Sequence, residues 1–348
     1  MTLILFILIF GVVVVSHEFG HFLVAKLNGI HVVEFSVGMG PNLVSFTKGD
    51  TKYSLKLLPI GGACMFEGED GVGETNGEPS EGSFNRAGVW ARIATVFAGP
   101  FFNFILGLIV AIIMVNLIHI TLPTVAVSPG SAAEEAGLMD DDTIVALNGE
   151  KIYLFSELSL FNHLNGGKSA NLTYERDGEL YDTVITPKWD EESGRYMLGV
   201  ACNKLAEERG IHRVKYAFYE MRFCVIQTYK GLLNLVQGQV KSEELAGPVG
   251  IAVNVVGKTY EETKEYGFLN VFVNMLNIVL LLTINLGILN LLPIPALDGG
   301  RLLFLLIEVV RGKPIPPEKE GMIHFAGLVF FMGLMVFVLF NDLRNIFG

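Results

Sequence analysis

Long apolar runs separated by polar stretches constrain this chain more than any other feature. The first run opens the chain, and residues 1–15 contain no charged side chain. A bilayer core takes roughly 20 residues of helix, so runs of this length predict membrane spans. The composition agrees, because 51% of the 348 residues are hydrophobic. We predict four membrane-spanning regions, at 1–27, 93–118, 268–310 and 321–342.

The first apolar run contains two histidines and a glutamate at a spacing typical of a zinc site. His17, Glu18 and His21 form the pattern His-Glu-x-x-His. Residues four apart share one face of a helix, so both imidazoles can bind one Zn²⁺ while Glu18 handles protons. Ionisable groups are costly inside a membrane-spanning helix, which favours a functional role over two packed histidines. We predict His17 and His21 as metal ligands and Glu18 as the catalytic base.

A carboxylate far downstream completes a candidate zinc set. Asp298 lies in the stretch NLLPIPALDGG, which begins at Asn290 near the end of the third apolar run. Two histidines and one carboxylate are a common catalytic zinc arrangement, with one position left for water. Pro293 and Pro295 cannot donate to a helical ladder, so the helix should break before Asp298. Taken alone, Asp298 could also be a helix cap beside two glycines; the histidine motif favours a metal ligand.

The two motifs together resemble the site-2 protease family (peptidase family M50) of intramembrane zinc metalloproteases, and the order of parts resembles its bacterial RseP/RasP-like branch. The resemblance implies a metalloendopeptidase of the bacterial inner (cytoplasmic) membrane. Its substrates would be single-span membrane proteins already shortened by another protease, such as anti-sigma factors, or signal-peptide remnants. The resemblance also implies that Asn290, Pro293 and Pro295 contact substrate.

Between the first two apolar runs, residues 28–92 contain glycine-punctuated segments that favour β structure. The segments 43–46 and 53–57 flank a glycine turn at 48–50, which predicts a β-hairpin. The family resemblance implies that this hairpin enters the membrane from the cytoplasmic side. There it would hold an unwound substrate by strand addition. A hairpin on the protein surface is the alternative.

Residues 122–202 alternate short strands with turn residues, which predicts a soluble insert. The insert resembles a permuted PDZ domain of bacterial proteases through its AGL, DxI and NG stretches, and the resemblance places it outside the cytoplasm. Leu198, Gly199 and Val200 match the carboxylate-binding loop of such domains, which receives a peptide C-terminus. A β-module that acts only as a steric gate is the alternative. Residues 203–267 then form an amphipathic linker region expected at the membrane surface.

Net charge limits the classes of binding partner, and cysteine spacing limits the possible metal sites and disulfides. The net charge of −11 speaks against nucleic acid, and we expect membrane proteins and lipid instead. The three cysteines show no metal-ligand spacing, although a Cys202–Cys224 disulfide is left open.

The stretch GPVGI at 247–251 matches a family signature for which the sequence offers no mechanism. Helix packing is the favoured role of Asn103 over lining the site. Surface or packing roles are assigned to His31, His119, His163, His212 and His324.

The expected fold class is a polytopic α-helical membrane protein with four spans, a membrane-associated β-hairpin and an inserted extracytoplasmic PDZ (α+β) domain. The alternative function is a catalytically inactive membrane scaffold that uses its PDZ domain and keeps zinc for structure. Glu18 argues against the scaffold, because a structural zinc site needs no general base. A metal transporter is disfavoured, because the metal cluster is not repeated in the other half of the chain.

Overall fold

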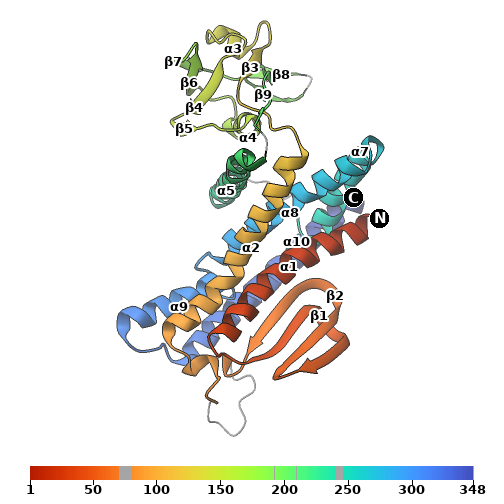
Figure 1. Ribbon diagram of the computed structural model, residues 1–348, viewed down its shortest axis with the longest axis vertical. Helices are drawn as coiled ribbons and strands as arrows, with labels where there is room; N and C mark the ends of the chain where they lie inside the picture. The colour runs from red at the N-terminus through yellow and green to blue at the C-terminus, as the bar shows by residue number, and fades with distance from the viewer. Residues whose placement is uncertain (70–79, 192, 209, 240–245, 348) are drawn as a thin grey trace. The chain divides into compact units, whose positions relative to one another are not determined.

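The computed structural model describes residues 1–69, 80–191, 193–208, 210–239 and 246–347. The chain divides into two compact units. One unit combines Met1–Val110 with Thr228–Gly348, and it carries the long apolar helices (Figure 1). The other unit, Ala111–Gln227, contains short strands and helices. Short helical turns occur at Phe84–Arg86 (η2), Gly210–Arg213 (η3) and Lys264–Tyr266 (η6).

The described residues contain four helices that are long and apolar enough to cross a membrane. They are α1 (Thr2–Leu27), α2 (Val89–Leu117), α8 (Phe268–Asn290) and α10 (Pro317–Phe347). The expectation of a multi-pass membrane protein is therefore confirmed. The predicted break in the third apolar run is also present, because α8 ends at Asn290 and a separate helix, α9 (Asp298–Arg311), follows.

Small residues bring α1, α2 and α8 close together. A Cβ atom added to Gly20 of α1 would lie 2.4 Å from the carbonyl oxygen of Ala98 in α2. Ser16 of α1 donates a hydrogen bond to the carbonyl oxygen of Phe102 at 3.2 Å. Thr283 of α8 donates to the carbonyl oxygen of Asn103 in α2 at 3.1 Å. Close backbone approach and interhelical hydrogen bonds are the usual means of helix association in a membrane.

The predicted hairpin is present, with strands longer than the sequence indicated. Strands β1 (Val32–Lys48) and β2 (Thr51–Phe66) run antiparallel and lie beside α1 (Figure 1). Each strand bends, so that Glu34 has both Met65 and Lys52 as Cα partners. The two strands thereby form a layer four segments wide, in which 62–66 and 42–48 are the edges. Glycines with positive φ lie at the bends, Gly38 (+87°) in β1 and Gly61 (+79°) in β2.

The GPVGI stretch has a structural explanation. It forms α6 (Pro248–Gly250), which continues into a π-helix, η5 (Ile251–Gly257), and then α7 (Lys258–Thr263). The buried carboxylate of Asp342 in α10 accepts hydrogen bonds from the backbone N–H groups of Gly247 at 3.0 Å and Gly250 at 2.8 Å. Asp342 therefore satisfies N–H groups that a helix N-terminus leaves unpaired. Added Cβ atoms at Gly247 and Gly250 would lie within 2.7 Å of this carboxylate, which explains both glycines.

The α+β unit is built around one hydrophobic core. Its main sheet has the strand order β5-β4-β6-β7, and two smaller pairs are β10-β3 and β8-β9. Leu138, Ile144, Leu172 and Leu198 belong to the core. No disulfide joins the cysteines of the described residues. The elements are β3 (Val125–Val127), α3 (Ala132–Glu135), β4 (Thr143–Leu147), β5 (Glu150–Lys151), α4 (Phe155–Asn165), β6 (Ala170–Arg176), β7 (Glu179–Ile185), β8 (Lys188–Asp190), β9 (Arg195–Met197), β10 (Val200–Cys202) and the start of α5 (Val214–Val236).

The strands and the helix α4 lie where the alternation of strands and turns predicted a soluble insert. A β-rich unit is thus present in this part of the chain. Its assignment as a PDZ domain stays a prediction.

Candidate metal centre

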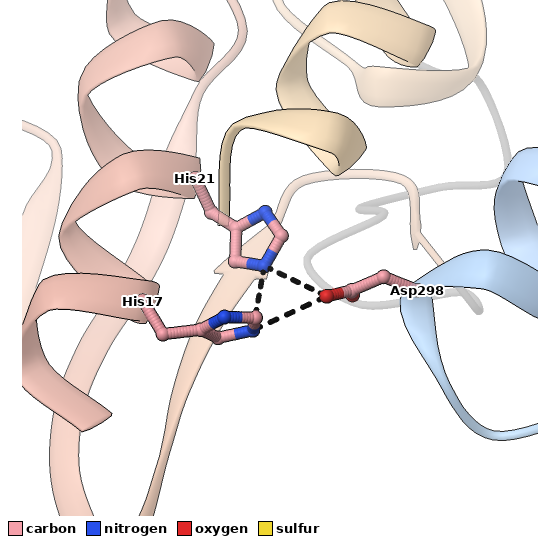
Figure 2. Close-up of side chains that lie close together, drawn as sticks. All are labelled: His17, His21 and Asp298. Carbon is pink, nitrogen blue, oxygen red and sulfur yellow. Dashed lines mark hydrogen bonds and ion pairs between the residues drawn. The ribbon is translucent and has the colours of Figure 1, made fainter. Parts of the chain in front are cut away.

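Three side chains from two distant helices converge on one point. His17 and His21 come from α1, and Asp298 is the first residue of α9 (Figure 2). Asp298 Oδ2 lies 3.2 Å from His17 Nε2 and 3.4 Å from His21 Nε2, and the two nitrogens are 3.2 Å apart. Within the described part of the chain, these residues form the group of His, Cys, Asp and Glu side chains that can hold a metal ion.

The geometry of the three atoms fits a zinc ion. Zinc binds histidine nitrogen and carboxylate oxygen at about 2.0–2.2 Å, so a tetrahedral ion holds neighbouring ligand atoms about 3.3 Å apart. The three observed separations lie close to this value. Asp298 Oδ2 is also buried and lacks an ordinary hydrogen-bond partner, although two imidazole nitrogens face it. A buried, unsatisfied carboxylate oxygen is costly unless a cation or a donor occupies the space before it.

Helix α2 orients both imidazole rings. His21 Nδ1 lies 2.9 Å from the carbonyl oxygen of Thr95, so it must carry the proton and donate it. The lone pair of His21 Nε2 is therefore available to a metal. An alanine at Gly99 would place its Cβ 2.1 Å from this nitrogen, so α2 needs glycine at the point of closest approach.

Asn103 performs the same task for His17, a role that the sequence alone placed second to helix packing. The buried Asn103 amide lies 3.1 Å from His17 Nδ1. Amide oxygen and nitrogen exchange places by a flip, and the hydrogen-bond network decides between them. With the oxygen toward the ring, it accepts the Nδ1 proton and leaves His17 Nε2 free for the metal. This orientation also gives a partner to an oxygen that otherwise has none.

The connection between α8 and α9 carries the other residues predicted from the second motif. Asn290 ends α8, and its amide nitrogen lies 3.2 Å from His17 Nε2. Pro293 and Pro295 lie in the connection itself, where the α-helix is interrupted. Added Cβ atoms at Gly299 and Gly300 would come within 2.1 and 2.4 Å of carbonyl oxygens in this connection. The two glycines after Asp298 therefore let α9 start directly against the turn.

Glu18 lines the same cavity as the three candidate ligands. The cavity has a volume of about 200 Å³ and is also lined by Cys64 and Arg301. Glu18 accepts a hydrogen bond from the backbone N–H of Cys64 in β2. Burial, with a smaller contribution from Glu18, raises the pKa of the Cys64 thiol. Arg301 forms an ion pair with Glu69 at the cavity wall.

The three residues predicted to bind a peptide C-terminus lie in the α+β unit. Leu198 is buried in its core, Gly199 has φ +77°, and Val200 begins β10. The carbonyl oxygens of Leu198 and Gly199 accept hydrogen bonds from N–H groups of the chain, each at 2.9 Å. Their peptide-binding role stays a prediction.

Comparison with known proteins agrees with this geometry. A sequence profile of peptidase family M50 matches residues 5–334. The chain is 31% identical over 424 aligned residues to the zinc metalloprotease RasP of Geobacillus kaustophilus, covering 99% of this chain and 98% of the relative. It is 32% identical over 427 residues to the regulator of sigma-W protease RasP of Bacillus subtilis, covering 99% of each. A putative zinc metalloprotease of Clostridium acetobutylicum is 31% identical over 342 residues, with 98% of this chain and 97% of the relative covered. The chain therefore belongs to peptidase family M50.

Proposed function

We infer that this protein is an intramembrane zinc metalloprotease that cleaves membrane-spanning segments of other proteins. The observation that carries the inference is the convergence of His17, His21 and Asp298 within 4.8 Å, with Glu18 lining the same cavity. His17, Glu18 and His21 all lie in α1, which is apolar and long enough to cross a bilayer. A structural zinc site in a scaffold would give no reason for Glu18 in this cavity.

The chain's own residues divide the chemistry between them. His17, His21 and Asp298 hold the zinc, which when bound acts as a Lewis acid toward water and the scissile carbonyl. Glu18 accepts a proton from the attacking water and returns it to the leaving amine. Thr95 and Asn103 fix the ring orientation of the two histidines. The Asn290 amide, beside His17 Nε2, donates to the oxygen that becomes negatively charged.

The edge of the β1–β2 layer supplies the substrate-binding surface. Segment 62–66 of β2 is an edge of the layer, and Gly62 approaches α1 so closely that an added Cβ would lie 2.8 Å from Glu18 Cγ. An extended peptide can add to such an edge by backbone hydrogen bonds. A transmembrane helix must unwind before its peptide bonds can be attacked, and strand addition holds the unwound form. Pro293 and Pro295, in the connection between α8 and α9, are proposed to contact the substrate because the family resemblance implies it.

The name of one relative supports a proposal for the substrate class. One of them is a regulator of sigma-W protease, so the substrates of this chain are single-span anti-sigma factors pre-cut by another protease, or signal-peptide remnants. The protein lies in the bacterial inner membrane in contact with lipid, with the 122–202 region as an extracytoplasmic PDZ domain. Its loop of Leu198, Gly199 and Val200 either captures a peptide C-terminus or belongs to a module that excludes substrates with bulky outer domains.

The test combines zinc content with cleavage of a tagged single-span substrate by purified protein in detergent. Glu18→Gln removes the base and leaves all three ligands, so we expect zinc retained and cleavage reduced at least a hundredfold. His21→Ala removes a ligand, so we expect zinc and cleavage to be lost together. Full cleavage by Glu18→Gln would contradict the role of Glu18. A wild-type protein that binds zinc and cleaves no member of a substrate panel would support the scaffold instead.

A further inference from the structure

The segment that delivers Asp298 to the metal centre is held from outside by α10. The backbone N–H of Ala296, two residues before Asp298, donates a hydrogen bond to Nδ1 of His324 at 3.0 Å. His324 lies in the first part of α10 and is separated from Ala296 by 28 residues. The sequence analysis assigned His324 only to the surface or to packing.

Ala296 needs such a partner because its backbone is strained. Its φ is +73°, in the left-handed region that residues with a Cβ atom rarely adopt. That conformation is unfavourable for a residue with a Cβ atom and persists only where surrounding contacts enforce it. A backbone N–H next to a membrane-embedded site also costs free energy if it is left without an acceptor. The hydrogen bond to His324 therefore acts on the residue whose conformation aims the chain toward Asp298.

Further contacts fix His324 and α10 against this connection. One turn along α10, an added Cβ at Gly327 would lie 2.6 Å from the carbonyl oxygen of Pro295. The His324 ring packs against Phe304 of α9, with centroids 5.4 Å apart at an interplanar angle of 63°. By contrast, none of the residues in the most apolar stretch of α10 is buried within the protein. The contacts with Pro295, Ala296 and Phe304 thus attach one end of α10, as the buried Asp342 attaches the other.

The hydrogen bond specifies one form of the imidazole. Nδ1 can accept from Ala296 only if it carries no proton, so the proton of the neutral ring is on Nε2. Glu320, one turn earlier in α10, has a carboxylate oxygen 4.0 Å from Nε2. The Glu320 carboxylate thus lies on the side of the ring that carries the proton.

We propose that His324 is a positioning residue for Asp298: its Nδ1 holds the Ala296 N–H, and this contact keeps the carboxylate within bonding distance of the zinc held by His17 and His21. The proposal rests on the zinc centre inferred above and extends it to the last span. The chain provides two complementary substitutions. His324→Asn keeps an acceptor at the position of Nδ1 and loses the ring, whereas His324→Phe keeps a ring against Phe304 and loses the acceptor.

The experiment measures metal binding and catalysis separately, on full-length protein in detergent. Zinc affinity is measured by competition with a chelator, and the visible spectrum of the cobalt(II)-substituted protein reports the ligand geometry. We expect His324→Phe to weaken zinc binding about 10–100-fold, as loss of a ligand-orienting group typically does, to alter the cobalt spectrum and to lower kcat with little change in KM. His324→Asn should stay within about threefold of wild type in each measurement.

Two results would overturn the proposal. One is wild-type zinc affinity and a wild-type cobalt spectrum in folded His324→Phe. The other is a loss in His324→Asn that equals or exceeds the loss in His324→Phe, since ring packing and not the acceptor would then be what matters. If His324→Phe does not fold, Ala296→Gly provides the second test, because glycine adopts φ +73° without strain. Ala296→Gly should then restore folding and metal binding to His324→Phe, and failure to do so would also refute the proposal. A wild-type protein without metal affinity would instead refute the proposed zinc centre itself.

Discussion

Glycine serves two different purposes in the metal-centre region and in the α+β unit. Around the metal centre, Gly20, Gly99, Gly299 and Gly300 have no positive φ, but an added Cβ on each would lie within 2.4 Å of a neighbouring atom. In the α+β unit, glycines such as Gly178 have positive φ and nothing within 4 Å of the added Cβ. In the first region glycine permits contact, and in the second it permits a turn.

The difference shows which region tolerates small changes in side-chain size. The α+β unit is stabilised by a hydrophobic core, and cores tolerate changes that conserve volume. The metal-centre region places backbone directly against the groups it orients, so a single added methyl group displaces a ligand. Changes in the first region should therefore act on chemistry, and changes in the second should act on stability.

The largest expected effect comes from adding a methyl group where α1 and α2 are in closest contact. Gly20→Ala would force its Cβ to within 2.4 Å of the Ala98 carbonyl oxygen, so α1 and His21 must move. We expect loss of zinc and of at least 99% of proteolytic activity. Gly11→Ala in the same helix is the matched control, because nothing lies within 4 Å of its added Cβ. Retained zinc in Gly20→Ala, or loss in both variants, would contradict the steric argument.

A smaller effect is expected from removing the group that orients His17. Asn103→Ala deletes the amide 3.1 Å from His17 Nδ1 and leaves the ring free to rotate. Loss of such a partner typically weakens metal binding 10–100-fold, and zinc competition measures this directly. Asn116→Ala removes an exposed amide that bonds only within α2 and should have no effect. An unchanged zinc affinity in Asn103→Ala would leave Asn103 with packing alone.

The stability of the α+β unit should depend on pH through Glu220. Burial, with a smaller contribution from Glu157, raises the pKa of Glu220 in α5 to about 7. The folded state therefore binds the proton more tightly than the unfolded state, and stability falls as pH rises from about 4.5 to 7. Glu220→Gln should match wild type at pH 5 and be more stable by about 1–3 kcal/mol at pH 8.

Thermal unfolding at the two pH values measures this difference. Glu208→Gln is the control of opposite sign, because the hydrogen bond from Lys215 lowers the pKa of Glu208 to about 2. That variant should be less stable than wild type at both pH values. Equal behaviour of Glu220→Gln and wild type at pH 8 would show that Glu220 is not held in a buried site.

The smallest expected effect comes from a glycine that permits a turn in the α+β unit. Gly178, with φ +82°, follows Asp177 in the turn between β6 and β7. Gly178→Ala should cost about 1–2 kcal/mol through backbone strain, seen as a lower Tm. Zinc content and kcat should not change. Gly178→Asn should lose less stability, since asparagine tolerates a positive φ. Loss of zinc in either variant would contradict the proposed separation between the metal-centre region and the α+β unit.

The proposed ligands could be identified in the sequence because their signals are local. His17 and His21 follow helical spacing, and Asp298 is an ionisable group at a proline break in an apolar run. The four long apolar helices were predictable for the same reason, since hydropathy depends on consecutive residues. The β1–β2 strands were underestimated because Gly38 resembles a strand end, whereas here it bends a strand that continues.

The supporting groups carry no such signal. Thr95 contributes a backbone oxygen, which any residue would supply, so no side-chain pattern can reveal it. Asn103 was considered, but a lone asparagine in a span is compatible with packing alone. His324 pairs with Ala296 only through the tertiary arrangement of α10. The GPVGI stretch needed Asp342, a residue some 90 positions later, before its glycines could be explained.

The distance along the chain between the two halves of the metal centre has a consequence for its biosynthesis. His17 and Asn290 are 273 residues apart, so at about 5–20 residues per second a ribosome needs roughly 15–55 s to go from one to the other. During that interval α1 is already in the membrane with its polar side chains. Thr95, Asn103 and the Phe102 carbonyl of α2 are made early and offer those side chains hydrogen bonds. The hydrogen bonds between α1 and α2 can thus form before Asp298 is synthesised.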